Sequence, residues 1–138
     1  GSRHRTAWLS VSDLVALRRR NNQPTKVKSF PVDGGRKSDG AKGISYYWGD
    51  TFYINTYNYK GNTSILSINT TANNGIATKA GIHVGMDKAV LLKTYGKPGF
   101  TYKHDGLTVY QYAPNGPQFL NFSLKNDKIV QISGGVDY

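Results

Sequence analysis

The sequence GMDKAVLLKTYGKP at residues 85–98 has the marks of a short helix with both ends defined. Asp87 is of a residue type that favours a helix N-terminus. Gly96 supplies a left-handed stop, and Pro98 prevents the helix from continuing. The apolar residues between these ends recur at spacings that place them on one face: Ala89, Val90, Leu92 and Tyr95. The stretch therefore predicts a helix at about residues 86–95.

Strand and turn signals follow this helix to the end of the chain. Asp105-Gly106 between alternating runs is a strong hairpin signal. The residues at 114–117 and 125–128 are of types that form turns. These turns separate four runs with strand character, at residues 99–103, 107–112, 119–124 and 129–133. The second half is thus predicted to be a helix followed by four antiparallel strands.

The first half repeats this order with lower fidelity. A shift of 74 residues aligns Asp13 with Asp87 and Pro24 with Pro98, which predicts a first helix at about residues 11–20. Residues 27–30 take the place of the first strand, and shifts of 63 to 68 align the strand-like runs at residues 43–47, 52–54 and 65–68. The main departure is a basic, glycine-rich loop at residues 33–42, which is either functional or merely mobile.

We therefore predict an α+β fold of two tandem units, each a helix plus a four-stranded antiparallel meander. The two units are expected to form one curved sheet with the helices on one face. The first unit is predicted at residues 1–70, the connector at 71–81 and the second unit at 82–138. A chain of 138 residues fits one compact domain, or two small units that share a core.

This tandem arrangement resembles the architecture of the β-lactamase inhibitory proteins, in which two such units pair into one eight-stranded sheet. The stretch at residues 81–98 also resembles the signature of the SmpA/OmlA (BamE-like) lipoproteins and of related uncharacterised secreted proteins of Firmicutes. The first unit lacks the Gly-Met and Tyr-Gly pairs of that signature. The resemblance implies a binding protein. The inhibitor family carries disulfides, whereas this chain has no cysteine.

The composition predicts a secreted or cell-envelope protein that is rich in strands. The absence of cysteine excludes disulfides, thiolate catalysis and cysteine metal sites. Asn, Gly, Tyr and Thr are abundant and Glu is absent, which favours short strands and turns over helices. No apolar stretch is long enough to span a membrane. The opening Gly1-Ser2 is typical of an expression tag remnant, so we expect that a signal segment has been removed.

The sequence contains few side chains in patterns typical of catalytic sites. All eight carboxylates are Asp, and most lie at expected helix starts, turns or the C-terminus. None of His4, His83 and His104 has the spacing of a metal-ligand pair. The pair His104-Asp105 has acid–base potential, but an exposed turn explains it better. We therefore predict no enzymatic activity, no metal and no cofactor.

The aromatic residues point instead to a binding surface. One face of an antiparallel sheet is covered and the other is open, so alternate residues of each strand share a face. Tyrosine provides rigid contact area with a polar end, and Ser and Asn provide adaptable hydrogen bonds. The alternative is that tyrosines simply favour strands. The predicted protein-binding residues of the open face are Tyr47, Trp48, Tyr53, Asn55, Tyr57, Tyr110, Tyr112 and Asn121.

The positive charge suggests a second class of partner. The net charge is +10, and residues 1–44 carry ten Lys or Arg against three Asp. An anionic polymer, such as nucleic acid or a cell-wall polyanion, is therefore an alternative to a protein partner. A structural envelope component is a third possibility. The basic residues and the tyrosines fall on different elements, which favours the protein partner. The candidate anion-binding residues are Arg18, Arg19, Arg20, Lys26, Lys28, Arg36 and Lys37.

Overall fold

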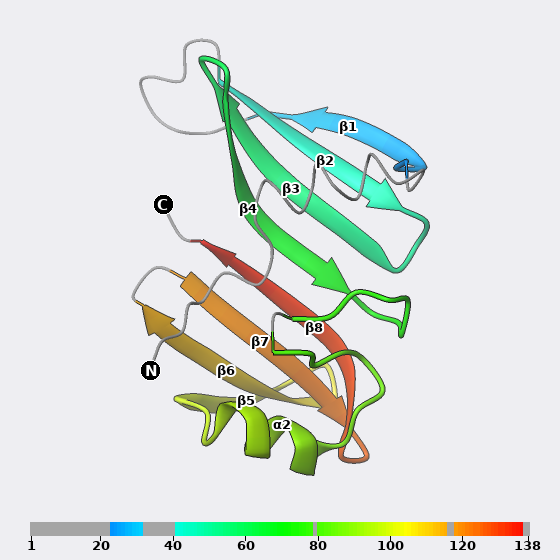
Figure 1. The fold of residues 1–138 in the computed structure, drawn as a ribbon, viewed down its shortest axis with the longest axis vertical. Coiled ribbons are helices and arrows are strands. Elements are labelled where there is room, and N and C mark those ends of the chain that lie inside the picture. The colour runs from blue at the N-terminus through cyan, green and yellow to red at the C-terminus, as the bar shows by residue number, and fades with distance from the viewer. Residues whose placement is uncertain (1–22, 32–40, 79, 116–117, 137–138) are drawn as a thin grey trace.

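The computed structural model describes residues 23–31, 41–78, 80–115 and 118–136 (Figure 1). Eight antiparallel strands form one sheet in the order β1-β2-β3-β4-β8-β7-β6-β5. Within these ranges the one helix is α2 (Lys88–Tyr95), which is far too short to cross a membrane, as predicted. The strands are β1 (Lys26–Phe30), β2 (Lys42–Trp48), β3 (Phe52–Tyr59), β4 (Asn62–Thr70), β5 (Phe100–His104), β6 (Leu107–Asn115), β7 (Gln118–Lys125) and β8 (Lys128–Val136).

The predicted fold class is wrong. We expected two helix-plus-four-strand units with helices on one face, and the described residues form one mostly β structure with a single short helix. Strand β4 pairs with β8 from Ser67↔Gly135 to Thr70↔Ile132, so the hydrogen-bonded ladder runs without a break through the middle of the sheet. The predicted helix at 11–20 and residues 33–40 of the predicted loop lie outside the described residues. The division into units at 1–70 and 82–138 stays a prediction.

Two-residue turns set the register of three hairpins. Asp105 and Gly106 both have positive φ, +52° and +80°, which confirms the predicted hairpin between β5 and β6. The β3–β4 and β7–β8 connections use the same backbone geometry at residues 60–61 and 126–127. Turns with two positive φ angles match the twist of antiparallel strands. Each one therefore fixes which residues of the two flanking strands lie opposite each other.

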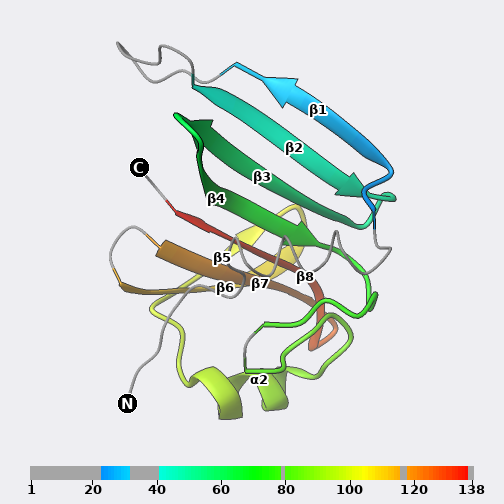
Figure 2. The same cartoon turned by 45° about the horizontal axis from the view of Figure 1, so that its top comes forward.

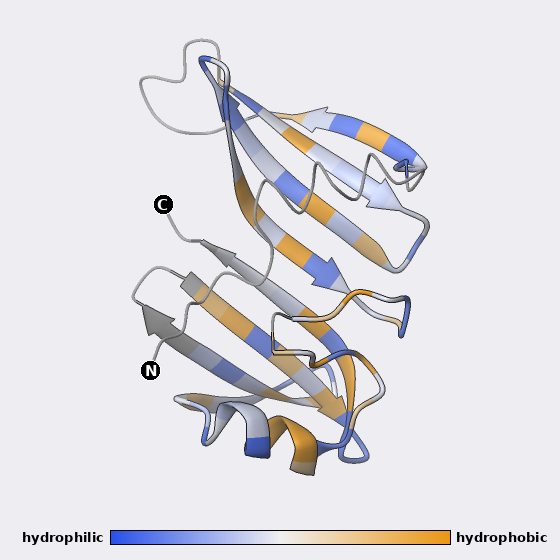
Figure 3. Cartoon of the chain, in the orientation of Figure 1, coloured by the Kyte–Doolittle hydropathy of each residue, from blue (hydrophilic) through white to orange (hydrophobic). Residues whose placement is uncertain are grey.

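The core lies on the face of the sheet that α2 covers. Along β3, Phe52, Ile54 and Thr56 are buried while the residues between them are half-buried, which is the two-residue period of a strand with one covered face. Leu91 of α2 is fully buried with Phe122 of β7. Figure 2 shows α2 beside the β5–β8 half of the sheet. Figure 3 shows apolar and polar bands alternating along the central strands.

The start of α2 is bonded to the β7–β8 hairpin. The Gly85 N–H donates to the Ile129 carbonyl at 2.8 Å, and the Ile129 N–H donates to the Met86 carbonyl at 2.9 Å. Asp87 occupies the N-cap position but makes no side-chain capping bond. Its carboxylate instead accepts a hydrogen bond from Lys128 Nζ at 2.6 Å. The helix therefore begins at residue 88, two residues later than predicted.

The end of α2 is held by an aromatic cluster. The Gly96 N–H donates to the Leu92 carbonyl with φ at +79°, which confirms the predicted helix stop. The Tyr112 hydroxyl donates to the Gly96 carbonyl at 2.8 Å, and the Tyr95 hydroxyl donates to Thr78 Oγ1 at 2.9 Å. The two tyrosine rings are 5.5 Å apart. These contacts fasten the helix to β6 and to the segment before the helix. Within the described ranges, no helix covers the opposite face of the sheet.

Candidate functional site

The face of the sheet opposite α2 carries tyrosines and short polar side chains. Tyr47 lies opposite Tyr53, and Ser45 lies opposite Asn55, in the pairing of β2 with β3. Directly opposite residues of an antiparallel pair share a face. Tyr57 follows Asn55 by two residues and so lies on the same face. We call this surface, on strands β1–β4, the open face.

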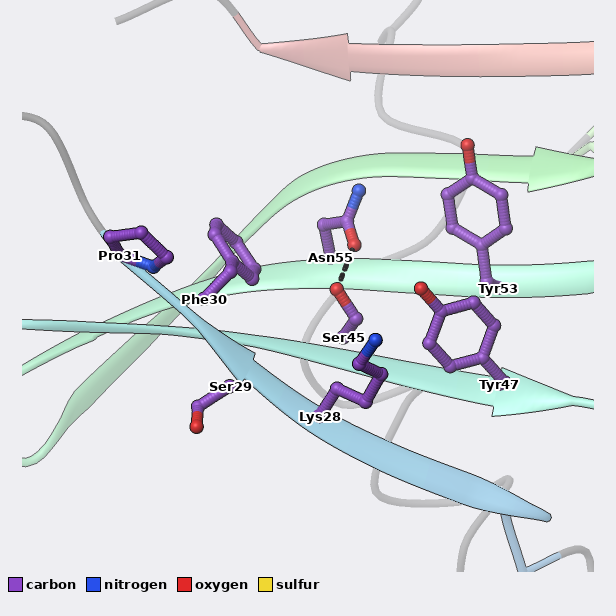
Figure 4. A pocket seen from close by; sticks show the side chains of 8 residues that line it. All are labelled: Lys28, Ser29, Phe30, Pro31, Ser45, Tyr47, Tyr53 and Asn55. Carbon is purple, nitrogen blue, oxygen red and sulfur yellow. Dashed lines mark hydrogen bonds between the residues drawn. The ribbon is translucent and has the colours of Figure 1, made fainter.

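A hollow of about 450 Å³ lies on the open face over β1, β2 and β3. Figure 4 shows the Lys28, Tyr47 and Tyr53 side chains on the same side of the strands, with Ser29 turned the other way. Tyr47 and Tyr53 form one end of the hollow, and the opposite end is apolar. The lining residues are Lys28, Ser29, Phe30, Pro31, Ser45, Tyr47, Tyr53 and Asn55.

The floor of the hollow is a chain of side-chain hydrogen bonds that crosses three strands. Ser45 Oγ donates to Asn55 Oδ1 at 2.6 Å, and Asn55 Nδ2 donates to Ser67 Oγ at 2.9 Å (Figure 4 shows the first bond). A similar bond joins the two halves of the sheet, from Gln131 Nε2 to Asn69 Oδ1 at 2.6 Å. These bonds fix the orientation of the Asn55 amide, so the polar floor is ordered before any ligand arrives.

The tyrosine end of the hollow combines aromatic rings with positive charge. The Tyr47 and Tyr53 ring centroids are 5.7 Å apart. Lys26 Nζ lies 4.6 Å from the centroid of the Tyr47 ring, a cation–π contact. Among the described residues, neither tyrosine hydroxyl has a hydrogen-bond partner and the Lys28 ammonium has no carboxylate partner. These groups remain available to a ligand.

The apolar end of the hollow depends on a glycine. Phe30 lies opposite Gly43 in the pairing of β1 with β2. The Phe30 ring occupies the space that a Cβ on Gly43 would need. A glycine beneath an aromatic ring on the neighbouring strand is a known device for stabilising sheet edges. Here it lets the ring lie flat across β2, where Phe30 and Pro31 line the hollow.

No family model matches the sequence, and no curated protein is similar to it. An extracellular protein containing an SCP domain, from Bacillus anthracis, matches with a TM-score of 0.51 and 8% identity over 99% of this chain and 49% of that chain. This likeness shows a shared fold. A cysteine-rich secretory protein from Staphylococcus aureus matches with a TM-score of 0.49 and 14% identity over 94% of this chain and 44% of that chain. A DUF4309 family protein from Bacillus subtilis matches with a TM-score of 0.44 and 14% identity over 89% of this chain and 77% of that chain.

These comparisons correct the resemblance inferred from the sequence. The three structures described above are SCP-domain, cysteine-rich secretory and DUF4309 proteins, and none of the three is a β-lactamase inhibitory protein or a BamE-like lipoprotein. The signature at residues 81–98 reflects one helix with defined ends, which is a local feature that unrelated folds share. The chain spans less than half the length of the Staphylococcus aureus and Bacillus anthracis proteins.

Three residues predicted for the open face lie on the other face. Trp48 lies opposite Phe52, and their ring centroids are 5.1 Å apart beside the core. Tyr112 is 8% exposed and packs against Phe122, and Tyr110 also packs against the core. For these three residues the predicted placement is wrong.

A one-residue error explains the tyrosines of β6. The 63-residue shift of the sequence repeat aligns residues 107–110 with residues 44–47, which places Tyr110 in the position of Tyr47. The structure instead gives Tyr110, opposite Phe122, the core-side position that Tyr46 has opposite Ile54. Because side chains alternate along a strand, a slip of one residue moves each of them to the opposite face. For Trp48 the sequence held the signal, since it follows the buried Tyr46 by two positions and so shares its face.

The remaining predicted residues of the open face lie outside the hollow. Tyr57 lies opposite Gly43, and its ring centroid is 6.5 Å from that of Tyr59. Asn121 lies on the same side of the sheet in β7, opposite Ser133. Its Oδ1 atom is buried and has no hydrogen-bond partner within the part of the chain that the structure describes. The hollow therefore brings together Tyr47, Tyr53 and Asn55 of the eight predicted residues.

Two of the predicted anion-binding residues adjoin the tyrosines. Lys26 lies opposite Tyr47 and Lys28 opposite Ser45. The expected separation of basic residues and tyrosines does not hold for these two, because β1 lies directly beside β2. No local pattern predicts the contributions of Phe30 and Pro31, because they depend on the pairing of β1 with β2. The other predicted residues lie outside the described ranges: Arg18, Arg19, Arg20, Arg36 and Lys37.

Proposed function

We propose that the chain is a secreted or cell-envelope binding module without catalytic activity, which captures another protein on its open face. One observation carries this proposal. Tyr47 and Tyr53 present two rings beside the fixed Ser45–Asn55 pair, and their hydroxyls have no hydrogen-bond partner among the described residues. Protein-binding surfaces favour this combination, because tyrosine loses little conformational entropy on binding while Ser and Asn adapt their hydrogen bonds.

The chemistry of the hollow supports binding over catalysis. Acid–base catalysis needs a positioned group that can exchange a proton near neutral pH. Among the described residues, those that line the hollow include one ammonium, two phenols, two hydroxyls and an amide, but neither a carboxylate nor an imidazole. The His104–Asp105 pair lies in the β5–β6 turn, with side chains 71% and 83% exposed. That pair is at the far edge of the sheet from the hollow.

Two observations support an extracellular location. The chain lacks cysteine and is rich in Asn, Gly, Tyr and Thr, which is the composition on which we predicted secretion. The Bacillus anthracis protein of similar fold is described as extracellular. We extend that location to this chain as part of the proposal.

An anionic polymer is the second candidate partner. Lys26 and Lys28 flank Tyr47 on the open face, and cations beside aromatic rings are typical of surfaces that bind single-stranded nucleic acids. Binding of this kind weakens steeply as salt rises. Retention of the protein on a heparin column therefore separates the two candidates. The retention of a polymer binder would fall steeply as salt rises. A protein binder would show only the weak retention expected from its net charge.

Capture of partner proteins tests the proposal directly. The immobilised chain is exposed to the culture fluid of the cells that produce it, and bound proteins are compared between variants. We expect the double variant Tyr47→Ala/Tyr53→Ala to lose the captured proteins. Tyr102→Ala is the matched control, because Tyr102 is also an exposed tyrosine but lies on the opposite edge strand, β5. Unchanged capture by the double variant would contradict the proposal.

A further inference from the structure

We infer that the hollow binds an acidic side chain, Asp or Glu, carried by an extended segment of the partner protein that lies along β1. This inference rests on the proposed function and specifies the chemistry of the partner. It is argued from the charge around Lys28, from the hydrogen-bonding groups beside it, and from the position of β1 at the edge of the sheet.

The charge of this part of the surface is unbalanced. The ion pairs among the described residues involve Lys88, Lys128 and His104, all of them in the α2 and β5–β8 half of the sheet. Lys28 has no such pair, and its neighbour Lys26 is held over the Tyr47 ring. The whole chain carries a net charge of +10. An acidic partner therefore complements both the hollow and the molecule.

The groups around Lys28 suit a carboxylate. An ionised carboxylate only accepts hydrogen bonds, whereas an ammonium and a phenol hydroxyl donate them. Figure 4 shows the Lys28 ammonium on the same side of β1 and β2 as the Tyr47 ring, beside Ser45. Bonds from an ammonium to a carboxylate are charge-assisted and about twice as strong as neutral ones. Phe30 and Pro31 provide an apolar end that the aliphatic part of the ligand can contact.

The position of β1 favours a peptide over a polysaccharide. β1 is an edge strand, so half of its backbone N–H and C=O groups have no partner in the sheet. An extended peptide can pair with those groups, and alternate side chains of that peptide then lie on the open face beside Lys26 and Lys28. A sugar polymer cannot make this ladder. The acidic peptide is therefore the ligand that uses both the edge and the hollow.

The test uses two capped peptides that differ only in charge. One has the sequence Thr-Glu-Thr-Glu-Thr and the other Thr-Gln-Thr-Gln-Thr, both of which favour an extended backbone. Each is titrated into the isotopically labelled protein while backbone amide resonances are followed. We expect the Glu peptide to shift the resonances of Lys28, Ser45, Tyr47 and Tyr53, and to bind at least about fivefold more tightly than the Gln peptide. Equal binding of the two peptides, or no binding of the Glu peptide, would overturn the inference.

Variants of Lys28 locate the carboxylate. Lys28→Gln is expected to weaken binding of the Glu peptide about two- to fivefold, the size of an exposed ion pair. Lys103→Gln is the matched control, because Lys103 is an exposed lysine on the other edge strand. Lys28→Glu should bind a Thr-Lys-Thr-Lys-Thr peptide in preference to the Glu peptide. If Lys28→Gln binds the Glu peptide as the unaltered protein does, the carboxylate is not at this position and the inference is wrong.

An acidic polysaccharide tests the choice of ligand class. Polygalacturonate that competes with the Glu peptide and binds more tightly, with the same dependence on Lys28, would overturn the assignment to a peptide. The inference and the proposed function fail separately. If loss of Tyr47 and Tyr53 abolishes protein capture while Lys28→Gln leaves peptide binding unchanged, the function stands and this inference falls. If the tyrosine variant captures proteins normally, the proposed function itself falls.

Discussion

The Phe30 ring lies across Gly43, on the neighbouring strand, and fills the space that any side chain at position 43 would need. The atoms that meet this space belong to the outer part of the ring, and Phe30 is half-buried. The ring can therefore rotate away. Because Phe30 also lines the hollow, this contact links the backbone of β2 to the shape of the candidate site.

Gly43→Ala should change the hollow more than the stability of the protein. We expect the free energy of unfolding in urea to fall by less than about 1 kcal/mol, since only a movable ring must shift. Binding of the Glu peptide should weaken, because the displaced ring enters the hollow. The variant Phe30→Ala/Gly43→Ala should bind as Phe30→Ala alone does. Weaker binding by the double variant than by Phe30→Ala would show that the ring does not transmit the effect.

Gly135→Ala should cost more stability than Gly43→Ala, because the atom nearest to the added Cβ would belong to the backbone. A Cβ on Gly135 would lie 2.7 Å from the Leu66 carbonyl oxygen and 3.0 Å from the Phe119 ring. Gly135 lies opposite Ser67, in the short pairing that joins the two halves of the sheet. Relief requires that β4 and β8 move apart, so we expect unfolding in urea to become easier by about 1–3 kcal/mol.

A second substitution shows whether the Leu66 carbonyl or the Phe119 ring determines the loss of stability in Gly135→Ala. Phe119→Ala removes the ring but leaves the Leu66 carbonyl in place. We therefore expect Phe119→Ala/Gly135→Ala to be no more stable than Gly135→Ala. Recovery of stability in the double variant would mean that the ring, and not the β4–β8 pairing, sets the cost.

Asn55→Ala should lower stability because it interrupts the polar floor. The Asn55 side chain accepts a hydrogen bond from Ser45 and donates one to Ser67. Ser45 is 8% exposed, so its hydroxyl would be left largely buried without that acceptor. The expected loss is about 1–2 kcal/mol in urea unfolding. Asn62→Ala, at the exposed start of β4, is the control, and an equal loss there would contradict the assigned role of the floor.

Local signals predicted the elements of this fold better than their assembly. The Asp105-Gly106 turn, the helix stop at Gly96 and most strand positions follow from residue types over a few positions. The pairing of β4 with β8 joins residues more than 60 positions apart, and no local pattern specifies it. The predicted fold class was wrong because the described residues are mostly strand with one short helix, although many of the strands were correctly placed.

The candidate site was predicted only in part for the same reason. Alternation along β3 identified Tyr53 and Asn55, because the buried residues of that strand recur at every second position. In β6 the pattern is ambiguous, since Val109 on one face and Tyr112 on the other are both buried. The Tyr95 ring of α2 packs against Tyr112, and this contact places the Tyr112 face of β6 in the core. Packing of this kind depends on tertiary structure that the strand sequence does not contain.

The stability of the protein should fall at high pH because two phenols that pack together, Tyr95 at the end of α2 and Tyr112 of β6, are shielded from water. Burial raises the pKa of Tyr112 from 10.0 to about 12, and burial also raises the pKa of Tyr95. The folded state therefore holds these protons more tightly than the unfolded state does. This contribution to the free energy of unfolding is complete below pH 10 and is lost as the pH rises from about 10 to 12, which urea unfolding at a series of pH values would measure.

Tyr112→Phe should remove the part of this decline that Tyr112 causes. The variant should also lower the free energy of unfolding at pH 8 by about 1 kcal/mol, because the hydrogen bond to the Gly96 carbonyl is lost. An undiminished decline in that variant would contradict the assignment to Tyr112.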